Sequence, residues 1–310
     1  MIDAAYISIM RRKFFDVLRT GAQEVGIKMR VLTSVFSLLI ITMNAGAMAQ
    51  ENFQGLETIG KPEPKGIGFQ FPATELMRDV VWLDNFLLII ITAISVFVTL
   101  LIAYASYKFH ISRNKQPGTF THNSVVEVMW TVIPVIILLF IGVFSLPILF
   151  KQQEIPEADI TIKVTGYQWY WGYEYVDHDF GFESVLLQKD ELAEYGYAPD
   201  EYLLATDAAV VIPVGATIVM QLTGADVIHA WTIPAFGVKQ DAVPGRLAQL
   251  WFAAEKEGIY FGQCSELCGQ SHAYMPITVK VVSQAQYDDW LKGAIEEYAG
   301  SPQNVMMAKK

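Results

Sequence analysis

Two long apolar runs and a series of shorter ones divide the chain into a membrane part and a β-rich part. Residues 86–104 and residues 129–150 contain no charged side chain. Each run is long enough to cross about 30 Å of hydrocarbon as a helix. The alternative, a buried helix of a soluble protein, fits uncharged runs of this length poorly. We therefore predict a two-helix transmembrane hairpin over residues 86–150.

Basic side chains predict the orientation of this hairpin. The connection between the two runs contains Lys108, Arg113 and Lys115, whereas only Arg78 lies shortly before the first run and Lys151 shortly after the second. Basic loops stay in the cytoplasm. This bias places the connection in the cytoplasm and both ends of the mature chain on the exported side.

From about residue 158 the pattern changes to short alternating or β-branched runs separated by Gly, Pro and Asp. Strands are predicted over residues 160–164, 209–222, 247–252 and 276–282. Short strands with regular turn signals are typical of a β-sandwich or barrel. Residues 287–298 have apolar and acidic positions at helical spacing and predict a short terminal helix.

The first 49 residues have the pattern of a secretory leader. Residues 30–49 combine a basic start, an apolar stretch and an Ala-x-Ala ending, which predicts cleavage before Gln50. Met29 is an alternative start to Met1. Residues 50–85 then form an exported N-terminal segment, and residues 301–310 a flexible tail.

Composition and charge agree with an exported membrane protein. Of 310 residues, 53% are hydrophobic, more than in an average soluble chain. Loss of the six basic and three acidic residues of the leader changes the formal charge from −10 to −13. Nucleic acid is excluded as a partner because phosphate binding needs a basic surface. A cationic protein partner is favoured.

Both cysteines of the chain lie in one cluster of soft metal ligands. Cys264 and Cys268 are followed by His272 and Met275, and His229 lies 35 residues upstream of Cys264. Sulfur donors select copper(I), zinc or iron–sulfur clusters over hard cations. Two bridging thiolates, one imidazole for each metal and a weak thioether fit a dinuclear copper site.

This cluster has three alternative interpretations. A structural zinc site has no use for Met275, and a mononuclear blue-copper site leaves one cysteine surplus. A disulfide between Cys264 and Cys268 is plausible in an exported domain, but it leaves both histidines and the methionine without a role.

Aromatic side chains are dense in residues 166–175. A single strand through residues 167–172 would place Tyr167, Trp169 and Trp171 on one face and the intervening residues on the other. Such alternating aromatics are most often sandwich core. Because both faces cannot be core, the alternative is an exposed aromatic patch that contacts a partner.

With these motifs, the chain resembles the bacterial subunit II of haem-copper cytochrome c oxidases over nearly all of its mature length. The matching segments are residues 264–275, 226–229, 166–175 and 239–246. The resemblance implies an α+β membrane protein, in which the transmembrane hairpin carries an exported cupredoxin-like Greek-key β-sandwich over residues 151–300. It also implies the bacterial inner membrane, with the copper domain in the periplasm.

The resemblance implies specific ligands. The dinuclear copper A centre would be held by the side chains of His229, Cys264, Cys268, His272 and Met275 and by the backbone carbonyl of Glu266. The side chain of Glu266 would bind magnesium at the junction with subunit I, which suits a hard carboxylate donor. From the sequence pattern alone, Glu266 is only an exposed loop acid.

The resemblance also implies partners and a direction of electron flow. Electrons from cytochrome c would enter at Trp169, reach copper and continue to haem in subunit I, where oxygen reduction and proton pumping occur next to subunit III. The docking face for cytochrome c would comprise Tyr170, Glu174, Asp177, Asp179, Glu183 and Asp226. Such acids are otherwise ordinary solvated surface.

Glu127 lies just before the second apolar run. The resemblance places a glutamate here at the entrance of a proton path into subunit I. A helix cap or a solvated acid is the alternative.

Rival functions leave part of the sequence without a role. A quinol oxidase subunit is expected to lack the copper ligands, and nitrous oxide reductase lacks this hairpin. A copper chaperone or a zinc module would not account for the aromatic run or Glu127. Covalently bound haem is excluded because the chain has no Cys-x-x-Cys-His motif.

Overall fold

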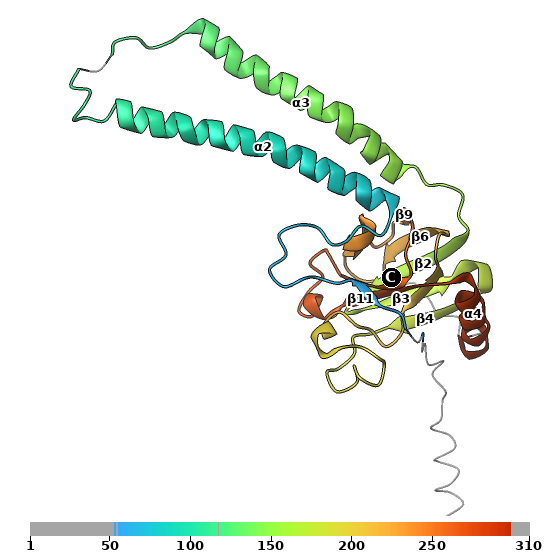
Figure 1. Ribbon diagram of the computed structural model, residues 1–310. Coiled ribbons are helices and arrows are strands. Elements are labelled where there is room, and N and C mark those ends of the chain that lie inside the picture. The colour runs from blue at the N-terminus through green and yellow to red at the C-terminus, as the bar shows by residue number, and fades with distance from the viewer. Residues whose placement is uncertain (1–52, 54, 117, 299–310) are drawn as a thin grey trace, which may run out of the picture. The chain divides into compact units, whose positions relative to one another are not determined.

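The computed structural model describes residue 53, residues 55–116 and residues 118–298. The predicted leader, its cleavage before Gln50, the alternative start at Met29 and the tail over residues 301–310 lie outside these ranges. Figure 1 shows two long helices followed by a β-rich domain, with a C-terminal helix against it.

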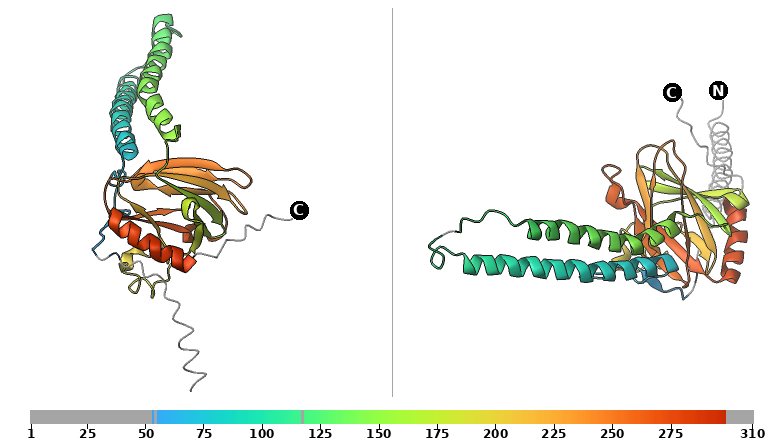
Figure 2. Two further views of the ribbon diagram at one scale, coloured as in Figure 1. Left: turned by 90° about the vertical axis from the view of Figure 1, so that its right-hand side faces the viewer. Right: turned by 90° about the horizontal axis from the view of Figure 1, so that it is seen from above.

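The two apolar runs are the central parts of two longer helices, α2 (Glu75–Lys108) and α3 (Ser124–Gln153). Both helices are long and apolar enough to cross a membrane. They lie side by side (Figure 2), and four aromatic rings pack between them with centroids 5.1–5.8 Å apart: Trp82, Phe86, Phe140 and Phe144. Thr74 and Asn123 cap the two helices, each accepting a hydrogen bond from a backbone N–H of the first turn.

The predicted sandwich is confirmed. One sheet has the order β4 (Phe180–Ser184), β3 (Tyr170–Tyr175), β2 (Ile160–Tyr167), β6 (Thr217–Gly224) and β9 (Ala248–Ala253). The other has the order β1 (Thr58–Gly60), β10 (Gly258–Gln263), β11 (Pro276–Val282) and β5 (Val210–Pro213). A separate hairpin joins β7 (His229–Ile233) and β8 (Val238–Ala242). The other helices within the described residues are η1 (Val176–His178), η2 (Pro199–Glu201), η3 (Pro234–Phe236), η4 (His272–Tyr274) and α4 (Gln284–Tyr298).

The four strands predicted from residue 158 onward hold with one correction. Three of the four predicted strands are present as β2, β9 and β11, and the terminal helix is α4. Residues 209–222 form two strands instead of one, because Gly215 adopts a left-handed φ of +83° and turns the chain between them. The two strands belong to different sheets. The apolar pattern continues through this turn, so periodicity alone could not detect the break.

β2 is packed against the core on one face and paired on both edges. Ile160, Ile162 and Val164 are buried between the sheets, while the alternate residues of β2 face partly outward. Large aromatic rings fill the remaining space, among them Trp171 and Trp231, which are both fully buried. A strand that is packed on its apolar face and paired on both edges restricts the position of the residues that follow it, here Gln168 and Trp169.

The transmembrane hairpin is joined to the sandwich by several hydrogen bonds. Ala73 N–H donates to the carbonyl of Ala235 at 2.9 Å, and the Thr74 hydroxyl donates to the carbonyl of Phe236 at 2.7 Å. Near the end of α3, Trp251 Nε1–H donates to the carbonyl of Lys151 at 3.1 Å. Trp251 lies beside the beginning of β6, because β9 runs antiparallel to it.

Candidate metal centre

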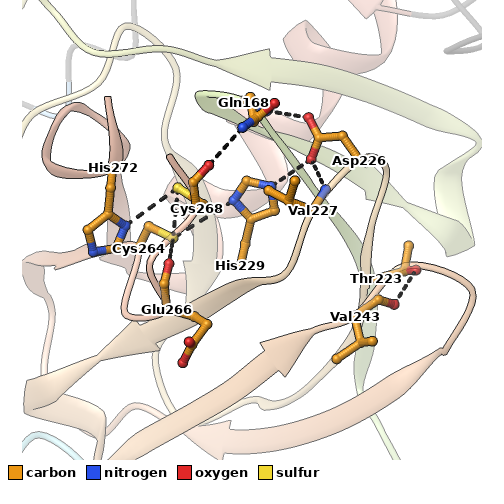
Figure 3. A network of polar contacts seen from close by, with 10 residues as sticks. All are labelled: Gln168, Thr223, Asp226, Val227, His229, Val243, Cys264, Glu266, Cys268 and His272. Atoms are coloured by element: carbon orange, nitrogen blue, oxygen red, sulfur yellow. Dashed lines mark hydrogen bonds and ion pairs between the residues drawn. The ribbon is translucent and has the colours of Figure 1, made fainter. Parts of the chain in front are cut away.

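The predicted metal ligands come together from three segments near the end of β2. His229 is the first residue of β7, Cys264 and Cys268 lie in the loop after β10, and His272 begins η4. Met275 follows η4 and precedes β11. Figure 3 shows both sulfur atoms and both imidazole rings directed toward one another.

The distances fit a site with shared sulfur ligands. Cys264 Sγ lies 3.8 Å from Cys268 Sγ and 3.9 Å from His229 Nδ1. Cys268 Sγ lies 3.5 Å from His272 Nδ1. Both cysteines are free and buried, so the disulfide alternative does not describe this structure. The donor atoms of His229, Cys264 and Cys268 all lie within 4.8 Å of one another.

The two remaining predicted ligands contribute in different ways. Cys264 Sγ lies 3.3 Å from the backbone carbonyl of Glu266, while the carboxylate of Glu266 points away from the sulfur atoms (Figure 3). Met275 is fully buried, and its carbonyl accepts a hydrogen bond from the Cys264 N–H at 3.0 Å. This backbone hydrogen bond therefore closes the loop independently of a metal ion.

The two thiols have opposite electrostatic environments. Burial raises the pKa of Cys264, but its hydrogen bonds with His229 and with backbone groups outweigh burial and lower the pKa of this thiol to about 6. Burial, followed by the charge of Cys264, raises the pKa of Cys268 to about 12. One thiolate forms readily, and a second beside it requires positive charge in the site. A metal cation held by Cys264 and Cys268 would supply that charge.

A carboxylate and an amide connect the metal-ligating segments, as Figure 3 shows. Asp226 Oδ1 lies 2.8 Å from His229 Nε2, and Asp226 Oδ2 accepts a hydrogen bond from the Gln168 N–H at 2.7 Å. The side-chain Nε2 of Gln168 donates to the carbonyl of Cys268 at 2.8 Å. The chain of hydrogen bonds thus runs from His229 to the cysteine loop.

The single strand predicted through residues 167–172 is wrong. The chain reverses at Gln168 and Trp169, so β2 ends at Tyr167 and β3 begins at Tyr170. Tyr167 and Tyr170 are paired across the two strands, and their rings stack at 4.8 Å. Trp171 is fully buried in the core, whereas Trp169 is half-buried at the tip of this hairpin. The two expected faces therefore do not exist.

Two glycines allow close approach around the site. A Cβ atom on Gly166 would lie 2.8 Å from Cδ2 of His229, so a side chain here would displace the imidazole. Gly269 has a φ of +124°, and a Cβ there would lie 2.9 Å from Gln168 Nε2 and 3.2 Å from Trp169 Cζ2. The Trp169 indole therefore lies against the loop that holds Cys268.

The predicted acidic face divides into two groups. Glu183 is paired with Gly172 on the neighbouring strand and lies near Tyr170, close to the Trp169 turn. Glu174 is paired with Lys163 at the other end of the hairpin, where its Oε2 lies 2.8 Å from Lys163 Nζ.

Asp177 and Asp179 lie beyond β3, at the same end as Glu174. The Asp177 carboxylate accepts a hydrogen bond from the Thr161 N–H at 3.1 Å, at the beginning of β2. Asp179 ends η1 in a left-handed conformation with φ +53°. Glu174, Asp177 and Asp179 are close to Trp169 in the sequence, but they are separated from it in space by the length of a strand.

Glu127 lies in the first turn of α3. Its Oε1 accepts a hydrogen bond from the Asn123 N–H at 3.3 Å, while Asn123 Oδ1 accepts one from the Val126 N–H at 3.2 Å. The glutamate thus takes part in capping the helix, as the alternative interpretation expected.

Sequence reasoning did not single out Gln168 or Gly166. Both belong to the aromatic motif, yet their roles depend on contacts with residues about 60 to 100 positions away: Gly166 beside His229, and Gln168 beside Asp226 and Cys268. The only local signal was a glycine and an amide within a strand otherwise rich in aromatic residues.

Comparisons with known proteins give a consistent result. Residues 160–282 match the family described as Cytochrome C oxidase subunit II, periplasmic domain, and residues 62–148 match its transmembrane domain. The chain is 60% identical over 264 residues to cytochrome c oxidase subunit 2 of Cereibacter sphaeroides, which covers 81% of this chain and 87% of that protein. It is 46% identical over 233 residues to a probable cytochrome c oxidase subunit 2 of Rickettsia bellii, covering 74% and 85%.

Among solved structures, the chain is similar to the crystal structure of the periplasmic domain of subunit II of cytochrome oxidase from Bradyrhizobium japonicum. The identity is 48% and the TM-score 0.43, with 47% of this chain and 100% of that chain covered.

Proposed function

Because the chain belongs to the cytochrome c oxidase subunit II family, whose members are electron-transfer subunits, we propose that it holds a dinuclear copper A centre in the periplasm. The observation that carries this proposal is the pair of free thiols 3.8 Å apart, each with an imidazole Nδ1 within 3.9 Å. When bound, the two copper ions supply a one-electron centre between cytochrome c and the haem of subunit I.

The contacts of the site support a specific set of copper ligands. Cys264 and Cys268 would supply thiolate sulfur, His229 and His272 one imidazole each, and Met275 a thioether. Soft donors on buried cysteine and methionine side chains suit copper better than magnesium or calcium. The carbonyl of Glu266 completes this set because it already lies against Cys264 Sγ.

Trp169 is the residue at which we propose that electrons enter. The turn that presents it is fixed on one side by β2 and β3 and on the other by the hydrogen bond from Gln168 to the Cys268 carbonyl. One edge of the indole faces Gly269 in the cysteine loop. A half-buried aromatic ring at a hairpin tip is well placed to contact a partner protein.

The proposed partner on this surface is a basic cytochrome c. Tyr170 and Glu183 lie beside the Trp169 turn and would contact the partner directly. Glu174, Asp177 and Asp179, at the far end of the hairpin, would act by long-range attraction, which raises the association rate more than the affinity.

Subunit I, with its haem and copper B, and subunit III are the proposed membrane partners, and the assembly would couple oxygen reduction to proton pumping as a translocase. The exposed carboxylate of Glu266 supports a magnesium site at the junction with subunit I. Magnesium is usually bound by one or two protein carboxylates together with other oxygen ligands, so further ligands would come from the partner. The same assembly would use Glu127 at the start of a proton path.

One spectroscopic experiment tests the proposed copper centre. The oxidase purified through a tag on this chain should show copper and haem together, with an electron spin signal from one unpaired electron shared by two copper ions. Cys268→Ser should abolish that signal while the haem signals remain. A fully metallated wild-type sample without the mixed-valence signal would refute the proposal.

The Glu127 proposal has a separate test. Glu127→Ala should slow turnover of the assembled oxidase and reduce proton pumping, whereas Glu127→Gln, which keeps an amide acceptor for the Asn123 N–H, separates proton transfer from capping. Unchanged turnover and pumping in both variants would reject the proton role.

A further inference from the structure

Both carboxylate oxygens of Asp226 form hydrogen bonds within the protein. A side chain that only attracts a partner protein by its charge does not need such bonds. Its Oδ1 lies 2.8 Å from His229 Nε2 and 2.6 Å from the backbone nitrogen of Val227. Its Oδ2 accepts a hydrogen bond from the backbone N–H of Gln168 at 2.7 Å. Both oxygens are therefore occupied by donors of the protein itself, although a third of the side chain is exposed.

The two ring nitrogens of His229 face different groups. Nε2 faces Asp226, and Nδ1 faces Cys264 Sγ at 3.9 Å. A carboxylate that accepts a hydrogen bond from Nε2–H favours the neutral tautomer in which Nδ1 carries no proton and can bind a metal. The ring itself is fully buried, with Gly166 against one side and the Trp171 ring 5.9 Å away.

We propose that Asp226 is a positioning residue of the metal centre: it orients His229 through Nε2 and ties it, through the Gln168 backbone, to the turn that carries Trp169. This inference rests on the proposed copper function and changes the role predicted for Asp226 from the sequence. Ligating histidines commonly donate their second N–H to a carboxylate, and loss of that partner weakens metal binding.

The two roles predict different results for the same substitutions. A docking charge acts only when cytochrome c is present, and it is lost equally in Asp226→Asn and Asp226→Ala. A positioning carboxylate acts on the centre itself. Asparagine offers one acceptor oxygen, so one of the N–H groups at the site would face an NH2 group, whereas alanine leaves the buried Nε2–H of His229 with no side-chain acceptor at position 226.

The test uses the assembled oxidase with the Asp226→Asn and Asp226→Ala variants, and Glu183→Gln as the control. Glu183 is an acid near the same turn, and no hydrogen bond or ion pair links it to a metal ligand among the described residues. Without cytochrome c, we measure the copper content during titration with a chelator, the copper electron spin signal and the reduction potential of the centre.

We expect Asp226→Ala to lower copper affinity by about 10- to 100-fold and Asp226→Asn to lower it less. Both should alter the copper hyperfine pattern, and both should raise the reduction potential because a negative charge near the oxidised centre is removed. Glu183→Gln should leave all three unchanged. Even if Asp226→Ala fails to assemble, Asp226→Asn carries the test.

The inference is overturned if Asp226→Asn has the copper affinity, hyperfine pattern and reduction potential of the wild type. If this variant shows only a salt-dependent loss of cytochrome c reactivity, Asp226 belongs to the docking face. Absence of the mixed-valence signal in the wild type would refute the copper proposal instead. The two failures are thus distinguishable.

Discussion

The two ends of β2 and β6 carry different kinds of contact. Where these strands end, His229, Asp226 and Gln168 are joined by hydrogen bonds of 2.7–2.8 Å around buried sulfur ligands. Where they begin, the contacts with the helices include exposed ion pairs, such as Arg78 with Glu255, whose side chains are 49% and 46% exposed. At the first end, the contacts hold the metal ligands in a defined geometry. At the second end, they join the sandwich to the two long helices.

This difference indicates where substitutions should matter. Hydrogen bonds to a buried ligand leave an unsatisfied group when one partner is lost, which costs about 1–3 kcal/mol. An exposed ion pair is replaced by water and contributes less than about 1 kcal/mol. We therefore expect large functional effects at the metal end and small effects on stability from the exposed ion pairs at the membrane end.

Trp169→Ala should have the largest effect on electron uptake. A central aromatic side chain at an interface commonly contributes about 2 kcal/mol or more, so the second-order rate constant for oxidation of cytochrome c should fall by at least about tenfold. Stopped-flow kinetics would measure this, with Trp169→Phe as the variant that keeps an aromatic ring. Copper signals like those of the wild type in both variants would show that the centre is intact.

Gly166→Ala tests whether the metal end is as tightly packed as the structure indicates. The new Cβ would lie 2.8–3.0 Å from three atoms of His229, and overpacking of this kind costs about 1–3 kcal/mol. We expect weaker copper binding and a lower melting temperature. The control is Gly293→Ala in α4, where a Cβ meets no atom within 4 Å and helix propensity improves. Equal effects of the two substitutions would contradict the close packing at Gly166.

The sequence predicted the elements better than their junctions. Apolar runs predicted α2 and α3, and alternation predicted β2, because both signals are local. The hairpin turn at Gln168 and Trp169 escaped prediction because tyrosines on both sides continue the aromatic pattern. Likewise, the acids of residues 174–183 form one group in the sequence but two in space, because β3 and η1 carry three of them away from Trp169.

For the site, ligand identity was predictable because cysteine, histidine and methionine at such short spacings are typical of a soft-metal centre. The role of Asp226 was not, since an acid near an aromatic motif has the same sequence pattern whether it faces a partner or a histidine. Only the position of β7 beside the end of β2 distinguishes the two. Long-range contacts of this kind have no periodic signal.

Charge substitutions at the two ends of the β2–β3 hairpin should differ moderately. Glu183→Gln removes an exposed charge beside the Trp169 turn, so association with cytochrome c should slow by about twofold to fivefold at low salt. Glu174→Gln should have a smaller effect because Lys163, 2.8 Å away, already compensates the charge. Rate constants measured over a range of ionic strength would test this, and identical losses in both variants would contradict it.

The smallest predicted effect concerns the membrane end. The hydrogen bond from Arg78 lowers the pKa of Glu255, so the stabilisation from this pair is present above the ordinary glutamate pKa and is lost as pH falls through the lowered value. Because both side chains are about half exposed, Glu255→Gln should lower stability at neutral pH by less than about 1 kcal/mol. Thermal unfolding in detergent should show the wild type and this variant converging in acid. If the difference in stability between the wild type and Glu255→Gln persists at low pH, Glu255 contributes by packing and not by its charge. The membrane end would then resemble the metal end in depending on close packing.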